Sequence, residues 1–101
     1  MEMNEISELS EIFKALSAPT RLKLVKILGE HEGALCVNAL ASKLDVSQSA
    51  VSQHLRVLRQ TGIVKSERRG SSVHYLLDQA SLKQYRALLR ETLGAVFEDG
   101  E

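Results

Sequence analysis

The sequence has one cysteine, one proline and no tryptophan among its 101 residues. The single cysteine, Cys36, cannot form an internal disulfide, which is usual for proteins of a reducing compartment. The uninterrupted apolar runs are far too short to span a bilayer, and the N-terminus lacks the basic start and apolar stretch of a signal peptide. We therefore expect a cytoplasmic protein that does not enter a membrane.

Enzyme motifs are missing as well. The chain contains no glycine-rich phosphate loop, no nucleophile elbow and no cluster of metal ligands. Cys36 with a distant histidine does not indicate a catalytic pair, so an enzyme is not expected. The sequence also lacks internal repeats, low-complexity segments and long linkers. Residues 1–101 are therefore expected to form a single domain with one modest core.

The formal net charge is zero, which at first argues against a nucleic-acid partner. The charges are unevenly distributed, however. Residues 46–75 hold five basic side chains and one acidic one, residues 1–34 hold four basic and six acidic, and residues 76–101 hold three basic and five acidic. Because charge attraction is screened beyond about 8–10 Å near physiological salt, a local basic patch matters more to DNA phosphates than the total does. The middle of the chain therefore indicates DNA binding.

Apolar periodicity predicts a mainly α-helical fold with one small β-hairpin, in the order α-α-α-α-β-β-α. Ser17 or Thr20 is expected to cap the second helix and Gly29 to end it. Residues 30–35 should form a connection with room for a short strand. The other expected bounds are 5–16, 20–28, 37–44 and 47–61 for helices, 63–69 and 73–77 for strands, and Asp78 or Ser81 onward for the last helix.

Residues 37–44 and 47–61 are two helices joined by a short turn, which predicts a helix-turn-helix. Ser47 is the expected N-cap of the second helix. Its expected buried stripe is Val51, Leu55 and Leu58. Its outward-facing side chains are Gln48, Ser49, Ser52, Gln53 and Arg56. Glutamine can pair with adenine, serine can donate or accept a hydrogen bond, and arginine favours guanine or phosphate, so this helix is expected to enter the major groove.

The hairpin has a basic tip, with Arg68 and Arg69 beside Gly70. Such a tip can lie along the DNA backbone or probe the minor groove. Taken singly, a polar helix face and a charged turn are most simply explained as solvated surface. The helix-turn-helix spacing, the basic hairpin and the local charge agree with one another, however, and this agreement favours double-stranded DNA as the partner.

Four segments resemble the ArsR/SmtB family of repressors. They are residues 13–28 (FKALSAPTRLKLVKIL), 35–41 (LCVNALA), 47–64 (SQSAVSQHLRVLRQTGIV) and 69–77 (RGSSVHYLL). The resemblance implies a winged helix-turn-helix, and a homodimeric repressor that an effector releases from an inverted-repeat operator. The family's DNA contacts fall on Gln48, Ser49, Ser52 and Gln53.

The family's two kinds of metal site are incomplete in this sequence. The first needs several thiolates, but Asn38 stands where the second cysteine of the family's box would be, and one thiolate makes a poor site for soft metals. The second lies on the last helix, where Asp78 fits but the remaining positions are Ala80, Glu91 and Gly94. His31, His54 and His74 are scattered over the chain. No metal ligand and no cofactor is therefore expected.

Cys36 leaves a second kind of regulation open. It lies just before an expected helix, and a helix N-terminus favours a reactive thiolate, so a thiol- or redox-responsive repressor is the alternative. The simpler interpretation, which we prefer, is a small buried apolar residue.

The terminal helices carry more apolar side chains than a small core needs, which predicts a homodimer interface. Its expected residues are Leu9, Phe13, Leu82, Tyr85, Leu89 and Leu93. Two modules held together would also bind DNA more tightly than one. A winged-helix module that binds protein remains the rival to a DNA-binding regulator, and activation remains open beside repression.

Overall fold

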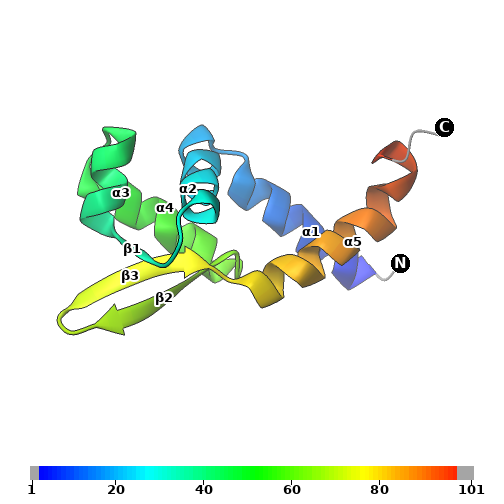
Figure 1. Ribbon diagram of the computed structural model, residues 1–101. Coiled ribbons are helices and arrows are strands. Elements are labelled where there is room, and N and C mark those ends of the chain that lie inside the picture. The colour runs from blue at the N-terminus through cyan, green and yellow to red at the C-terminus, as the bar shows by residue number, and fades with distance from the viewer. Residues whose placement is uncertain (1–2, 98–101) are drawn as a thin grey trace.

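The computed structural model describes residues 3–97, with side chains described through residue 94. The elements follow the predicted order, with one additional short strand (Figure 1). They are α1 (Met3–Leu16), α2 (Pro19–Glu30), β1 (Leu35–Cys36), α3 (Val37–Leu44), α4 (Gln48–Gln60), β2 (Val64–Arg69), β3 (Ser72–Leu77) and α5 (Gln79–Phe97). The chain is therefore mainly helical, and its strands form a small wing beside a helix-turn-helix.

The three strands form one antiparallel sheet in the order β1-β3-β2. The hairpin β2–β3 turns at Gly70 and Ser71, and Gly70 adopts a φ of 64°, a left-handed conformation that glycine tolerates without steric cost. Strand β1 pairs Leu35 with Tyr75 on the other edge of β3. A strand of two residues has no periodicity, so the sequence predicted only the space for it.

The ends of α2 differ from the predicted ones. Ala18 is the N-cap and makes no side-chain capping bond, while Pro19 occupies the first helical position, where its missing N–H costs nothing. The Ser17 hydroxyl instead donates back to the Lys14 carbonyl at 2.7 Å. Gly29 does not end the helix, which continues to Glu30. Glycine can remain helical at a cost of about 1 kcal/mol, which tertiary packing offsets here.

The core is built from one apolar stripe of each helix together with the base of the wing. The predicted stripe of α4 is confirmed, since Val51 and Leu58 are completely buried and Leu55 is 1% exposed. The other largest fully buried side chains are Leu24, Leu40 and Ile63. These residues hold α4 against α2, α3 and β2 and so fix the side of α4 that faces solvent.

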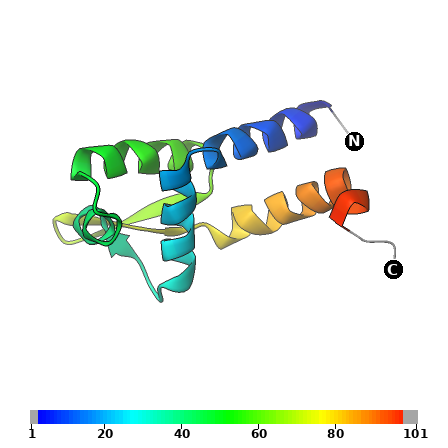
Figure 2. The same cartoon turned by 90° about the horizontal axis from the view of Figure 1, so that it is seen from above.

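The elements are distributed between two ends of an elongated molecule measuring 47 × 25 × 23 Å. Helices α1 and α5 lie side by side at one end, with both chain termini, while α2 runs across between the two ends (Figure 2). The other end carries α3, the first turn of α4 and the wing. No helix within residues 3–97 is both long and apolar enough to cross a membrane.

Candidate nucleic-acid interface

The turn between α3 and α4 fixes the start of α4 at the surface. Asp45 ends α3 in the left-handed region, with a φ of 55°, and the Val46 N–H donates to the Ala41 carbonyl at 3.1 Å. The Ser47 hydroxyl then accepts a hydrogen bond from the Ala50 N–H at 3.1 Å, which confirms Ser47 as the N-cap of α4.

The face of α4 away from the core carries all the predicted base-reading side chains. Gln48, Ser49, Ser52, Gln53 and Arg56 are each exposed. Because the buried stripe fixes the rotation of the helix about its axis, these polar groups project outward together. They offer amide, hydroxyl and guanidinium groups, which are the groups that hydrogen-bond to base edges.

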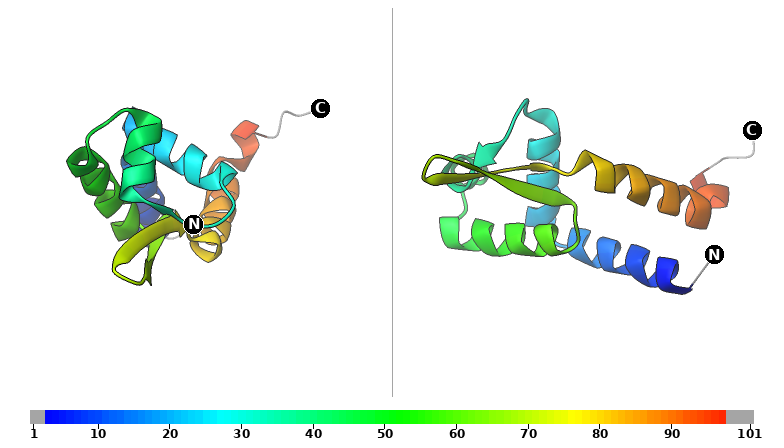
Figure 3. Two further views of the ribbon diagram at one scale, coloured as in Figure 1. Left: turned by 60° about the vertical axis from the view of Figure 1, so that its left-hand side comes forward. Right: turned by 90° about the horizontal axis from the view of Figure 1, so that it is seen from below.

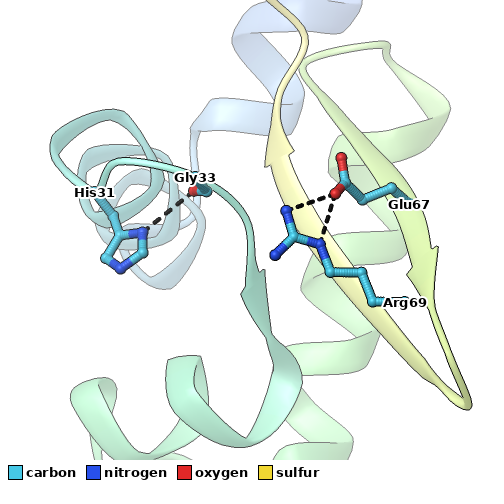
Figure 4. Close-up of polar contacts among 4 residues, drawn as sticks. All are labelled: His31, Gly33, Glu67 and Arg69. Atoms are coloured by element: carbon cyan, nitrogen blue, oxygen red, sulfur yellow. Dashed lines mark hydrogen bonds and ion pairs between the residues drawn. The ribbon is translucent and has the colours of Figure 1, made fainter.

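The wing presents its two arginines differently. Glu67 and Arg69 stand two residues apart on β2 and so share one face of the sheet. The Arg69 guanidinium donates to the Glu67 carboxylate through Nη2 at 2.7 Å and Nε at 2.8 Å (Figure 4). Arg68 is exposed and enters no ion pair among the described residues. The sequence showed Glu67 as a charge but did not reveal that it engages Arg69, although the two-residue spacing on a strand was a usable signal.

The first turn of α4 and the tip of the wing lie at the same end of the molecule, opposite the termini (Figure 3). One DNA duplex can therefore contact both elements while α1 and α5 point away from it. This shared orientation is the main geometric requirement of the predicted DNA-binding surface.

Cys36, the candidate redox residue, is half-buried at the N-cap of α3. The strand register places it directly across from His74, which in turn pairs with Glu67, so the three residues form a row across the sheet. The Nδ1 atom of His74 is buried and has no hydrogen-bond partner among the described residues. Cys36 and His74 are far apart in the sequence, so their pairing on neighbouring strands could not be predicted from it.

The remaining histidines are separated from that row. His31 lies in the connection after α2, where its Nδ1 and the Gly33 carbonyl oxygen are 3.2 Å apart (Figure 4). His54 is half-buried on α4. Across the part of the chain that the structure describes, no three His, Cys, Asp or Glu side chains are grouped so that they could hold a metal ion.

Five of the six predicted interface residues line an apolar cavity of about 210 Å³ between α1 and α5. Phe13, Leu82, Tyr85 and Leu89 line it and retain exposed surface, whereas Leu9 is only 4% exposed and belongs to the core of a single chain. Leu93 lies further along α5 and is half-buried. Phe13, with 45% of its surface exposed, is the largest apolar side chain presented here.

Tyr85 connects this end of the molecule to the C-terminal end of α4. Its hydroxyl donates a hydrogen bond to the Thr61 carbonyl at the C-cap of α4. Burial raises the pKa of Tyr85 above its ordinary value, with further contributions from the nearby carboxylates of Glu8 and Asp78. Gly62, which has a φ of 80°, passes so close that a Cβ there would lie 3.0 Å from the tyrosine oxygen. The sequence predicted Tyr85 only as an interface residue.

Comparison with known proteins identifies the family. A family model described as "Bacterial regulatory protein, arsR family" matches residues 18–66. The arsenic resistance transcriptional regulator ArsR1 of Pseudomonas putida is 34% identical over 93 residues, which make up 92% of this chain and 72% of that protein. The chain belongs to the ArsR family. The solved structure of an ArsR-like transcriptional regulator from Rhodococcus sp. RHA1 is similar with a TM-score of 0.78 and 30% identity, covering 95% of this chain and 88% of that one.

The ArsR-family relatives include longer proteins. A transcriptional repressor described as an SmtB homolog, from Synechocystis sp., is 41% identical over 87 residues. The matched region is 85% of the present chain but 64% of that relative, so this chain spans less than two thirds of its length. The resemblance predicted from the sequence motifs is thus confirmed at the level of the family and of the winged helix-turn-helix fold.

Proposed function

We propose that this ArsR-family chain is a cytoplasmic, homodimeric repressor that binds an inverted-repeat operator in double-stranded DNA. The observation that carries the proposal is the exposed row of polar side chains at the start of α4, on the same end of the molecule as the wing tip. Helix α4 would lie in the major groove, and the wing would contact the adjacent backbone.

The residues divide between reading and holding the DNA. Gln48, Ser49, Ser52 and Gln53 present hydrogen-bonding groups without net charge, which suits base edges. Arg56 and Arg68 are exposed charges that suit phosphates. Arg69 forms an ion pair with Glu67, with 2.7 Å between Nη2 and the carboxylate oxygen. It should therefore contribute less to DNA affinity than Arg68, unless DNA binding separates the pair.

Substitutions at Gln53 and Arg68 should therefore have different consequences. Gln53→Ala should change which operator is preferred, since one good side-chain pair with a base contributes about 1–3 kcal/mol of discrimination. Arg68→Ala should weaken binding to all sequences alike and reduce the slope of log affinity against log salt by about one unit. Selection of binding sites from a random library, followed by titrations at several salt concentrations, measures both effects.

The matched control is Arg90→Ala, which removes an exposed arginine from α5 at the other end of the molecule. It should leave both preference and salt slope unchanged. The division of roles would be wrong if Arg68→Ala altered base preference while Gln53→Ala left it intact. DNA affinity that does not fall with salt would favour the rival protein-interaction module.

We further propose that regulation does not use the family's metal sites. Cys36 lacks a second thiolate because residue 38 is asparagine, and the last helix offers Glu91 and Gly94 where ligands would be needed. Calorimetric titration with zinc and with cadmium should show no submicromolar binding. Tight binding that loosens the DNA complex, and that Cys36→Ser or Asp78→Ala abolishes, would contradict this.

A thiol-responsive repressor is the second candidate. Its support is the position of Cys36 at the start of α3, opposite His74 on the neighbouring strand, because both a helix N-terminus and a histidine can activate a thiol. Modification there would alter the first helix of the helix-turn-helix pair. Peroxide or persulfide treatment that releases DNA from the parent chain, but not from Cys36→Ser, would establish this candidate.

A further inference from the structure

A second and larger cavity, of about 520 Å³, lies between α1, α2, the end of α4 and α5. Its volume is in the range of small-molecule sites in proteins. The apolar side chains of Ile12, Ala15 and Val57 line part of it, and the rest of the lining is polar. The DNA-reading face of α4 contributes nothing to this cavity, so it is separate from the proposed DNA surface.

Arg21 brings a positive charge to the lining of this cavity. It is half-buried in the first turn of α2, and its Nε atom is buried without a hydrogen-bond partner among the described residues. Buried polar groups are nearly always paired, because an unpaired buried donor is costly. A guanidinium is matched by a carboxylate, which can accept two of its N–H groups at once.

The charged side chains of the cavity are arranged by sign along α1. Lys14 stands near the end of α1 and Arg21 in the first turn of α2, so these two cations lie on either side of the junction between the two helices, and both line the cavity. Glu8 and Glu11 line the cavity one to two turns earlier, and Glu8 is about 9 Å from Lys14 along the helix axis at a rise of about 1.5 Å per residue. No ion pair joins these acids to these bases within the described residues.

A cavity with a cationic end and an acidic end disfavours a simple anion and a simple amine alike. We propose that it binds a small zwitterion, an ω-amino carboxylate whose carboxylate contacts Arg21 and Lys14 and whose ammonium group contacts Glu8. Each end of such a ligand meets the opposite charge, and its methylene chain covers the apolar lining. Glu11, between the two ends, is available to the ammonium of shorter ligands.

The cavity is also placed to influence DNA binding, an inference that rests on the proposed function. Gln60 and Thr61, at the C-terminal end of the recognition helix, contribute to its lining. Tyr85 from α5 also lines the cavity, and its hydroxyl donates a hydrogen bond to the Thr61 carbonyl. A ligand between α1 and this junction would shift the equilibrium between orientations of α4 relative to α5, and hence relative to DNA.

Calorimetry on the whole chain without DNA tests the site, with 6-aminohexanoate as probe and with hexanoate and hexylamine as matched single-charge controls. We expect 6-aminohexanoate to bind at least about tenfold more tightly than either control, because it alone satisfies both ends. Arg21→Gln should weaken its binding about tenfold or more. Glu8→Gln should remove the advantage of 6-aminohexanoate over hexanoate, because the ammonium group loses its partner and the repulsion of a simple anion falls. Arg90→Gln, on the exposed surface of α5, should change nothing.

Several results would overturn the proposal. One is equal binding of hexanoate and 6-aminohexanoate, another is no binding of any probe at millimolar concentration, and a third is full affinity in Arg21→Gln. If Arg21→Gln shifted the monomer–dimer equilibrium and left ligand affinity unchanged, the cavity would instead be a contact with a second copy of the chain. Operator titrations with and without 6-aminohexanoate form a separate arm. Ligand binding without DNA binding would refute the proposed function but support the ligand site. DNA binding without ligand binding would refute the ligand site but support the proposed function.

Discussion

Leu58→Ala should lower the free energy of unfolding by about 2–5 kcal/mol, the range for truncating a buried leucine. Leu58 is completely buried where α4 meets the rest of the core. The loss has two parts, which are the favourable free energy of burying the removed groups on folding and the cost of the cavity that remains. Because a small domain is stable by only about 5–15 kcal/mol, this single change should remove a large part of the total.

The matched control is Leu22→Ala on α2, where the leucine is 51% exposed and leaves no enclosed cavity. Urea unfolding followed by circular dichroism, at one fixed protein concentration, measures both variants. Concentration must be held constant because dimerisation would add to the apparent stability. If the two substitutions lowered the free energy of unfolding equally, Leu58 would not hold α4 in the way that its burial indicates.

The sequence predicted α4 well because several independent signals agree there. Ser47 caps the helix, the stripe of Val51 and Leu58 fixes its rotation, and Gly62 follows its end with the positive φ that only glycine adopts freely. Knowing the buried side is enough to know the exposed side. The face proposed to meet DNA could therefore be derived from spacing alone.

Local signals were weaker where packing decides the outcome. Gly29 remains helical because α2 is held against the core, although glycine usually favours a helix end. Strand β1 forms only because β3 offers a free edge to Leu35 and Cys36. Neither outcome can be derived from the residues concerned, since each depends on a partner elsewhere in the chain.

The contacts that connect distant elements were beyond sequence analysis altogether. Tyr85 reaches Thr61 across 24 positions, and Cys36 faces His74 through the pairing of two strands. The cavity around Arg21 requires four helices to be placed relative to one another. Periodicity identifies which side of a helix is buried, but it does not identify the residue on the neighbouring element.

Phe13→Glu should convert the proposed dimer to a monomer. Phe13 is the most exposed of the large apolar side chains that line the apolar cavity between α1 and α5, at 45%. A carboxylate there would have to be buried without a partner when two copies meet, which is strongly unfavourable. The expected consequence is a loss of operator affinity of about 10²–10⁴-fold, because the second helix-turn-helix would no longer be held near its half-site.

Sedimentation equilibrium at micromolar concentration measures the first effect, and operator titration measures the second. Leu22→Glu provides the control, since it places the same charge on an exposed leucine that does not line this cavity. For the proposed dimer of the parent chain, the preferred operator should be an inverted repeat with half-sites about 34–36 Å apart or a multiple of that distance.

A parent chain that is already monomeric at micromolar concentration would remove the basis of this prediction. If the Phe13→Glu variant remained dimeric, the two copies would meet through another surface. If the dimer were lost while operator affinity stayed unchanged, each module would bind DNA independently.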